Sequence, residues 1–544
     1  MAIQVSGTQV IGNSRELTNI ASVDATTAAS IQAAGVGGAS GEQNFVAAEA
    51  ITAGNVLGLN SVGKVANRGV ILGANTQTYN NNQNEKVFYG TWDPDNEFFI
   101  YGIGYYGDSS TRRIGYVVGQ VNSDKSISAA SARLTTPGNY SKNLGMAYDT
   151  NANKVVAYLF DNGSNTAKVV VGTVNSNKTI SWGSLTSTPF GAEAYYCMGM
   201  CFDPSTNKCV FVGSSGPYTF DVRACVGTVS GTSISFGSVT AAGGSNAAQN
   251  ERVAIHVPGA NKNVVLWQEA RNNKFNIIAR STTISGTSLS FGSEGVITPT
   301  GNFEQDGMAV VADPTSGSSK FLVVNWDSNL GTMYAIVGTL SGTSITFGTP
   351  YALFQTSDFE VTGETSTSVK GKSASLALVP NTNSIVLGIQ VFSSQFRRIF
   401  TQPLTISGTT VVPGPRTEMV KTTDDAASMD QVRAFLLPDY AQNYNVMSTA
   451  VAGAVYRTTS SRSFQGLPAQ FIGIAAENIS SGATGAVTVL GGVNTSLSGL
   501  DVGVTYGLKK SSADLVAISD ADERVGRAVS ATSLYIDKGF GETN

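Results

Sequence analysis

One short phrase occurs six times along this chain at nearly constant spacing, and it constrains the fold more than any other feature. The copies are NSDKSISAA at 122–130, NSNKTISWG at 175–183, SGTSISFG at 230–237, SGTSLSFG at 285–292, SGTSITFG at 341–348 and SGTTVVPG at 407–414. They start 53, 55, 55, 56 and 66 residues apart. A period in this range indicates a repeat architecture, in which specificity resides in the loops that differ between units.

Each phrase reads as a β-hairpin, because apolar and small polar residues alternate on both sides of a turn that contains Gly or Asn. A second hairpin precedes each phrase, as shown by the alignment of GMAYDTNANKVVAYLF (145–160) with GMCFDPSTNKCVFVGS (199–214). One unit is therefore four short antiparallel strands, which is the composition of a β-propeller blade.

Counting the first strands gives seven units. The seventh, RAFLLP (433–438) followed by NYNVMSTAV (443–451), lacks the repeated hairpin. RGVILGA (68–74) precedes the first unit, and we expect it to supply the missing outer strand beside 453–461 and so close the ring. An open stack of hairpins is the alternative, but the regular period and the extra strand favour the closed ring.

The composition agrees with an all-β particle or extracellular protein. Charged residues are 13% of the chain, about half the usual share, and Gly accounts for 60 of 544 residues. The net charge is −4 with no basic run, which argues against nucleic-acid binding, and no apolar stretch reaches the ~20 residues of a membrane span. MAIQVSGTQV (1–10) lacks the features of a signal peptide, so release by lysis, as in a virus particle, is expected.

The segments that flank the repeats share a pattern of their own. Residues 45–65 and 471–493 both contain Ala-Glu-x-Ile-x-x-Gly, at 48–54 and 476–482, and both read as strand, Gly turn, strand. We expect one small β module, split in sequence, with the propeller inserted into it. The predicted domains are an N-terminal arm and linker (1–42), the first half of the module (43–67), a seven-bladed propeller (68–464), and the second half of the module with the C-terminus (465–544).

The first 42 residues are interpreted as an assembly arm. Asp24 suits the cap of a short helix over 25–34, and 35–43 reads as a flexible linker. The preceding stretch is polar but carries five apolar residues that it is too short to bury alone: Ile3, Val5, Val10, Leu17 and Ile20. These apolar residues are explained if the arm becomes ordered against a neighbouring subunit or virion protein. The alternative is a frayed terminus.

The terminal segments resemble a known family. IQVSGTQVIGNSRELTNI (3–20) is similar to the N-terminal segment of tailed-bacteriophage virion proteins of the tail-fibre class, marine-phage type. Three C-terminal phrases resemble the C-terminal module of the same group, whose propeller repeats the SGTS phrases also resemble: FIGIAAENISSGATGAVTVLGGV (471–493), LSGLDVGVTYGL (497–508) and VGRAVSAT (525–532). The resemblance implies a virion structural protein on the particle surface or tail. It also implies attachment to other virion proteins through residues 1–42 and a homo-oligomer, often a trimer.

The same phrases also resemble the Ser-x-Asp-x-Gly-x-Thr-Trp hairpin of sialidase-type propellers. Asp is absent from nearly every copy, however, and Trp occurs only at Trp182. A sialidase activity is therefore not implied.

Most candidates for catalysis or metal binding have a structural interpretation. His256 is the only histidine and occupies a strand position that holds Trp92, Tyr148 and Phe202 in other units, so it reads as a blade residue without a nucleophile motif. DPDNE (93–97) is too short for a calcium loop and reads as a turn. The four cysteines lack metal-site spacing and read as buried thiols, with a Cys201–Cys209 bridge as a minor alternative: Cys197, Cys201, Cys209 and Cys225. No cofactor or metal site is predicted.

Loops at one end of the ring carry aromatic, acidic and Arg side chains together, a combination that suits sugar binding through stacking and bidentate hydrogen bonds. The longest insertion, about 350–373, contributes to this set. The alternative is that these loops are polar because they are solvated. The predicted binding residues are Tyr105, Tyr106, Tyr195, Tyr196, Tyr218, Arg252, Arg271, Glu304, Asp306, Trp326, Phe359 and Glu360.

The sequence thus predicts a tail fibre or related phage appendage that displays a propeller toward a host-surface polysaccharide and binds it without cleavage. A purely structural particle component, such as a head decoration or tail adaptor, is one alternative. A glycan hydrolase or lyase is another, because such enzymes use two carboxylates, but no acid here has a recognisable catalytic context.

Overall fold

The computed structural model of the chain describes residues 3–5, 8–11, 42–47, 50–59, 65–67, 71–72, 76–79, 84–106, 113–133, 140–161, 164, 166–192, 199–214, 221–243, 247–272, 274–299, 301–303, 308–327, 329–355, 370–380, 382–392, 397–414, 416–422, 435–442, 444–452, 457–465, 471–508, 515–517 and 523–536. Regular structure in these residues is β-strand apart from one short 3-10 helix, η1 (Pro258–Ala260). The expected all-β class is confirmed. The predicted helix at 25–34 lies outside the described residues.

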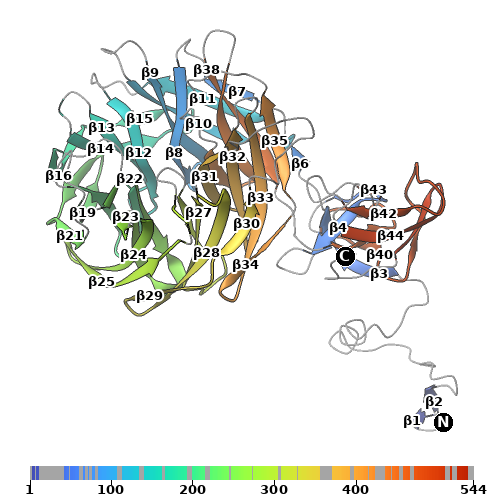
Figure 1. Ribbon diagram of the computed structural model, residues 1–544. Helices are drawn as coiled ribbons and strands as arrows, with labels where there is room; N and C mark the ends of the chain where they lie inside the picture. The colour runs from blue at the N-terminus through green and yellow to red at the C-terminus, as the bar shows by residue number, and fades with distance from the viewer. Residues whose placement is uncertain are drawn as a thin grey trace.

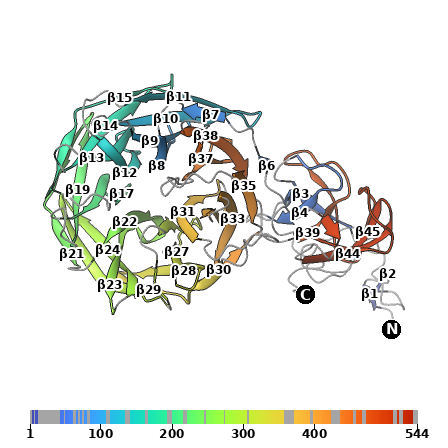
Figure 2. The ribbon, with the colours of Figure 1, turned by 45° about the horizontal axis from the view of Figure 1, so that its top comes forward.

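Among the described residues, seven antiparallel sheets follow one another around a ring (Figure 2). The first three are sheet 1, with β8 (Asn84–Asp93), β9 (Phe98–Tyr106), β10 (Arg113–Val121) and β11 (Ile127–Arg133); sheet 2, with β12 (Tyr140–Asp149), β13 (Lys154–Asp161), β14 (Thr166–Val174), β15 (Ile180–Trp182) and β16 (Thr186–Ala192); and sheet 3, with β17 (Gly199–Asp203), β18 (Lys208–Gly213), β19 (Val222–Ser230), β20 (Ser233–Phe236) and β21 (Thr240–Gly243).

The next three sheets continue the pattern. They are sheet 4, with β22 (Ala247–Val257), β23 (Lys262–Arg271), β24 (Lys274–Ser285) and β25 (Ser288–Ile297); sheet 5, with β26 (Ala309–Ala312), β27 (Lys320–Asp327), β28 (Thr332–Ser341), β29 (Ser344–Phe347) and β30 (Tyr351–Gln355); and sheet 6, with β31 (Lys370–Leu378), β32 (Ser384–Phe392), β33 (Arg397–Ser407), β34 (Thr410–Pro413) and β35 (Thr417–Thr422).

Sheet 7 joins the two ends of the ring. It contains β36 (Phe435–Asp439), β37 (Tyr444–Ala452) and β38 (Arg457–Gln465), and its outer strands β6 (Ile71–Leu72) and β7 (Thr76–Tyr79) come from before sheet 1. Leu72 pairs with Phe464, and Thr76 pairs with Ser461. The strand expected from 68–74 therefore does close the ring, although β6 pairs at 464–465 rather than within 453–461.

The core is divided among the sheet interfaces. Each pair of neighbouring sheets encloses one apolar cluster of buried residues, including the pair formed by sheets 7 and 1. The first strands contact one another around the axis, and β36 contacts β8. Burying a Val, Leu, Ile or Phe side chain stabilises the fold by about 1.5–3 kcal/mol, so the stability of the ring is spread over all its interfaces.

The repeated phrase has two structural functions. In SGTSISFG the register pairs Ser230 with Ser233, which leaves a two-residue turn in which Gly231 has a φ of 60°. Glycine adopts this left-handed conformation without steric cost. In four of the six copies the last glycine lies against the turn threonine of the next sheet, so a Cβ at Gly237 would collide with the carbonyl oxygen of Thr287. The phrase therefore recurs because it forms a turn and also packs neighbouring sheets together.

A small module lies beside the ring (Figure 1). One of its sheets has the strand order β3 (Glu42–Val46), β40 (Thr484–Thr488), β39 (Phe471–Ala475), β4 (Val56–Leu59), β5 (Val65–Asn67). This sheet therefore combines three strands from before the propeller with two from after it, and the two later strands lie between β3 and β4. A second sheet has the order β41 (Val493–Asn494), β45 (Ser533–Ile536), β44 (Glu523–Ser530), β42 (Thr505–Leu508), β43 (Leu515–Ala517), and a separate hairpin joins β1 (Ile3–Val5) to β2 (Thr8–Ile11).

The two Ala-Glu-x-Ile-x-x-Gly segments face each other in this module. Ile51 and Ile479 exchange backbone hydrogen bonds, each N–H donating to the other carbonyl at 2.8 Å. Gly482 N–H donates to the Ala47 carbonyl at 2.9 Å, and the equivalent Gly54 N–H donates to the Ala475 carbonyl at 2.8 Å. The shared sequence pattern therefore marks two copies of one structural unit that pair about a local two-fold relation.

Candidate functional site

The turns that join the first and second strand of each sheet form one end of the ring, here called the turn face. Five of them start at a buried aspartate whose carboxylate accepts backbone N–H groups from the turn: Asp93, Asp149, Asp203, Asp313 and Asp439. For Asp149 the donors are Asn151 at 3.0 Å and Ala152 at 2.9 Å. Asp93 acts in the same way within DPDNE, so that segment is the predicted turn.

An aromatic hollow of about 530 Å³ lies on the turn face where sheets 1, 2 and 7 meet. We call it the first hollow, and it is lined by Thr91, Trp92, Pro94, Glu97, Tyr148, Thr150, Pro438, Tyr440 and Ala441. The rings of Trp92 and Tyr440 meet edge to face, with centroids 5.8 Å apart. Tyr440 is 39% exposed, so part of this aromatic pair is open to a ligand.

A hydrogen bond from sheet 2 to sheet 1 fixes one wall of the first hollow. The Tyr148 hydroxyl donates to Asp95 Oδ2 at 2.7 Å. Burial, followed by the hydrogen bond to Asp95, raises the pKa of Tyr148 far above its usual value, so the hydroxyl keeps its proton and remains a donor. Glu97 has a φ of 57° at the end of the same turn, and its side chain is exposed.

A second hollow of about 670 Å³ lies over the turns of sheets 4, 5, 6 and 7. It is lined by Pro258, Gly259, Ala312, Asp313, Pro314, Thr315, Ser316, Gly317, Leu378, Val379, Thr382 and Tyr440. Tyr440 belongs to both hollows. The carboxylate of Asp313 accepts the Thr315 N–H at 3.0 Å and the Ser318 hydroxyl at 2.6 Å, which stabilises the turn beneath the hollow.

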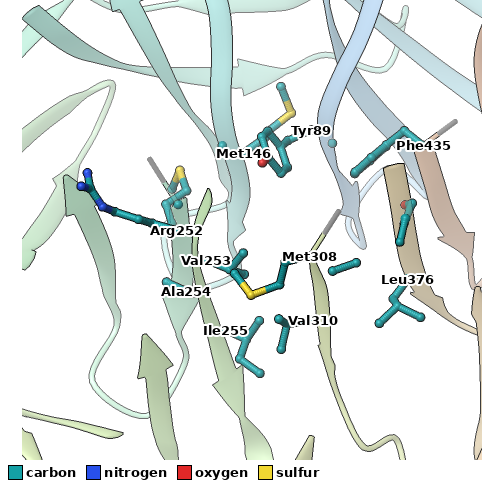
Figure 3. Close-up of a pocket in the computed structure, with 17 residues that line it drawn as sticks. Tyr89, Met146, Arg252, Val253, Ala254, Ile255, Met308, Val310, Leu376 and Phe435 are labelled. Carbon is teal, nitrogen blue, oxygen red and sulfur yellow. The ribbon is translucent and has the colours of Figure 1, made fainter. Parts of the chain in front are cut away.

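A cavity of about 210 Å³ lies on the ring axis, between the first strands (Figure 3). Most of its lining is apolar and includes Met146, Met308 and Phe435. Arg252 is the one charged residue among the described lining residues, and its guanidinium points away from Met308 in Figure 3. The axial cavity therefore offers a ligand little hydrogen-bonding capacity from these side chains.

His256 belongs to a buried polar cluster between sheets 3 and 4. Asn263 Nδ2 donates to Asp203 Oδ2 at 2.8 Å, and Asn263 Oδ1 lies 3.0 Å from His256 Nδ1. Because this amide oxygen accepts only, Nδ1 carries the hydrogen. Burial raises the pKa of Asp203, but hydrogen bonds from Ser205 and Asn263 outweigh it and leave the pKa below its usual value. The cluster links two sheets, which supports a structural function for His256.

Three cysteines lie in the described residues, and all are buried thiols: Cys201, Cys209 and Cys225. The register pairs Cys201 with Val210, so a Cys201–Cys209 bridge is not formed. Burial raises the pKa of the Cys201 thiol, which therefore stays neutral. Cys197 lies outside the described residues. In the part of the chain that the structure describes, no group of three or more His, Cys, Asp or Glu side chains could hold a metal ion.

The structure brings few of the predicted binding residues together. Trp326 is a wrong prediction, because its side chain is 2% exposed and packs beside Phe354, with ring centroids 6.0 Å apart. Arg252 is also buried, at 2% exposure. Arg271 is half-buried and donates to Glu269 at 2.8 Å and to Glu294 at 2.6 Å, which makes it part of a surface ion-pair cluster on sheet 4.

The side chains of the other predicted binding residues are not among those that the structure describes. Tyr105 and Tyr106 end strand β9, but their side chains are not described. Seven more lie outside the described residues: Tyr195, Tyr196, Tyr218, Glu304, Asp306, Phe359 and Glu360. Tyr440 is absent from the predicted set, although an aromatic residue directly after the turn aspartate Asp439 is a usable sequence signal. Trp92 was predicted to be structural only.

No protein-family model and no curated protein matches this sequence. Solved structures that resemble it include the periplasmic gluconolactonase of Pseudomonas aeruginosa, with 9% identity over 70% of this chain and 95% of that chain and a TM-score of 0.40. The β-propeller domain of the Trilobed protease from Pyrococcus furiosus has 8% identity over 70% and 95%, with a TM-score of 0.35. The lectin of Aleuria aurantia has 13% identity over 64% and 99%, with a TM-score of 0.35. The propeller assignment itself follows from the sheet order and the ring closure described above.

Proposed function

We propose that this chain is a virion protein of a tailed bacteriophage, a tail fibre or related appendage, whose propeller binds a host-surface glycan. The observation that carries the binding function is the first hollow, where Trp92 and the exposed Tyr440 lie beside Glu97 and the hydroxyl of Thr150. Sugar rings have apolar faces that stack on aromatic side chains, and hydroxyl groups that bond to carboxylates and hydroxyls.

Binding without cleavage fits the carboxylates of this hollow. Glycosidases need a general acid in apolar surroundings together with a second carboxylate at a defined separation. Asp95 and Glu97 are exposed side chains, and Asp95 Oδ2 already accepts the Tyr148 hydroxyl. The proposal is therefore a lectin-like function rather than a hydrolase or lyase.

The virion part of the proposal is supported by the resemblance of the terminal phrases to phage virion proteins. In this proposal residues 1–42 attach the chain to other virion proteins, and the chain assembles as a homo-oligomer, a trimer in the family's common form. The hairpin of β1 and β2 gives the arm a structured start, with Val5 paired to Thr8. No helix in the described residues is long and apolar enough to cross a membrane.

A structural role without a receptor is the second candidate. Five exposed large apolar side chains lie on or beside the second sheet of the module: Leu490, Val493, Val502, Val529 and Tyr535. Exposed apolar groups in this number are frequent where proteins assemble. These exposed side chains favour contacts within a particle. Both candidate functions require such contacts, so only an assay of binding to host cells distinguishes one function from the other.

The test is binding of the fluorescently labelled full-length chain to susceptible host cells, before and after enzymatic removal of their surface polysaccharide. Loss of binding after removal is expected. Equal binding before and after, or none in either case, would contradict the glycan receptor function. Deleting residues 1–40 should leave the propeller soluble and abolish incorporation into particles, whereas normal incorporation would contradict the assembly function of the arm.

A further inference from the structure

We propose that the two hollows of the turn face form a single extended site for an uncharged oligosaccharide, with Tyr440 as the platform between its two halves. This inference rests on the proposed glycan-binding function and adds the substrate class and the site. It places the ligand on the turn face, on residues other than those predicted from the sequence.

Tyr440 connects the two hollows because it lines both of them. Its backbone is fixed by the residue before it. Asp439 Oδ1 accepts the N–H groups of Ala441 and Gln442, each at 3.0 Å, and Asp439 Oδ2 accepts the N–H of Val121 in sheet 1 at 3.1 Å. The edge-to-face contact with Trp92 orients the ring from the other side. The platform is therefore largely pre-organised, which reduces the entropic cost of binding.

The size of the site suits a chain rather than a single sugar. The hollows measure about 530 and 670 Å³, and each falls within the ~300–1,000 Å³ range of small-molecule sites. Prolines supply rigid apolar walls in both hollows: Pro94 and Pro438 in the first, and Pro258 and Pro314 in the second. Tyr440 is the lining residue that the two hollows share, so a ligand that spans both would pass over it.

The charge of the lining selects against acidic sugars. Among the described lining residues of both hollows there is no Lys or Arg, whereas Glu97 and Asp313 each carry a carboxylate. The lysines that follow three of these turns are already hydrogen-bonded. Lys154 Nζ donates to the carbonyl oxygens of Ala152 and Asn153, each at 3.2 Å. Lys208 Nζ donates to Thr228 Oγ1 at 2.8 Å, and Lys262 Nζ donates to Thr283 Oγ1 at 3.0 Å. A uronate, sulfate or sialate group would therefore meet negative charge without a compensating cation.

Hydroxyl groups provide the polar contacts that an uncharged sugar needs. Thr150 borders the first hollow, while Thr315, Ser316 and Thr382 border the second. Each of these hydroxyls can donate or accept a hydrogen bond, so it can pair with a sugar hydroxyl that acts as either acceptor or donor.

The experiment uses the full-length chain and the surface polysaccharide of a susceptible host, separated by anion exchange into an uncharged and an acidic fraction. The two fractions compete against labelled protein for binding to host cells. The uncharged fraction is expected to compete, and the acidic fraction is not. Tyr440→Ala should weaken binding of the uncharged fraction by roughly tenfold or more, as for other central aromatic contacts. Tyr351→Ala is the matched control, because Tyr351 is 38% exposed but lies on β30, away from both hollows.

A charge reversal tests the selectivity directly. Glu97→Lys introduces a lysine at a position with positive φ. This chain already holds lysines in that backbone conformation, since Lys125 and Lys178 have φ values of 70° and 63°. The variant should gain binding of the acidic fraction while it keeps the fold.

The outcomes separate the two proposals. Competition by the acidic fraction alone, or undiminished binding by Tyr440→Ala, would overturn the present inference and leave glycan recognition standing at another site. Competition by neither fraction would overturn both.

Discussion

Replacing Gly338 by Ala should destabilise sheet 5 by a predictable amount. Gly338 is the glycine of IVGTL in β28, and it lies over the ring of Phe321 in β27. An added Cβ would lie 2.6 Å from both Cε1 and Cε2 of that ring, and closer still to Cζ. Phe321 is fully buried, so the ring must shift against well-packed neighbours. Overpacking of this kind costs about 1–3 kcal/mol.

A double-mutant cycle with Phe321→Leu tests the cause. The shorter side chain leaves room for the new methyl group, so the double variant should lose at least about 1 kcal/mol less than the sum of the single variants. The assay is urea unfolding followed by tryptophan fluorescence, for which Trp326 is a buried reporter on the same strand as Phe321.

Gly342→Ala is the control for the cycle. Gly342 has a φ of 62° with no atom within 4 Å of a built Cβ, so its replacement costs about 1–2 kcal/mol through backbone strain alone. That variant should show no coupling to Phe321→Leu. Strict additivity for the Gly338 pair would refute the argument that the ring excludes a side chain at this position.

Three further results are expected. Burial raises the pKa of Asp203, but its hydrogen bonds outweigh this effect and hold the pKa below 3.8, so its stabilisation is complete above pH 3.8 and is lost as the pH falls. The urea midpoints of wild type and Asp203→Asn should therefore converge as the pH falls below 3.8, and a gap independent of pH would contradict this. Deleting residues 71–79 removes the strands that pair with β38, and should lower the unfolding midpoint and speed proteolysis of sheet 7, unlike a deletion of equal length at 12–20. Ile51→Ala and Ile479→Ala should destabilise the module equally, each by about 2–5 kcal/mol, because the two side chains occupy equivalent buried positions; clearly unequal losses in thermal unfolding would count against the two-fold relation.

The repeats made the propeller predictable because each hairpin is a local pattern. Alternation and turn residues define a strand pair within about 15 residues, and a constant period then repeats it. Ring closure was also predictable, because 68–74 reads as a strand with no partner in its own neighbourhood. The module followed from two copies of one pattern, at 48–54 and 476–482.

The binding site was less predictable, since it depends on which side chains the ring leaves exposed. Trp326 lies next to the last residue of its strand and looks available in the sequence, but Phe354 from β30 packs beside it. Tyr440 follows a buried aspartate, and its position between two hollows arises only when seven turns meet around the axis. Such proximity between distant segments is a property of the closed ring and has no local sequence signal.

The split module also governs how firmly the ring stays closed. Strand β4 pairs with both β5 and β39, so Asn67 and Phe471 are held in one sheet. Only three residues separate β5 from β6, and five separate β38 from β39. The two strands that join the ring are thus tethered to a common support by short linkers, which gives them an effective concentration in the millimolar range or above. A closing strand that detaches from β38 is therefore kept close to its partner, so the module should oppose opening of the propeller.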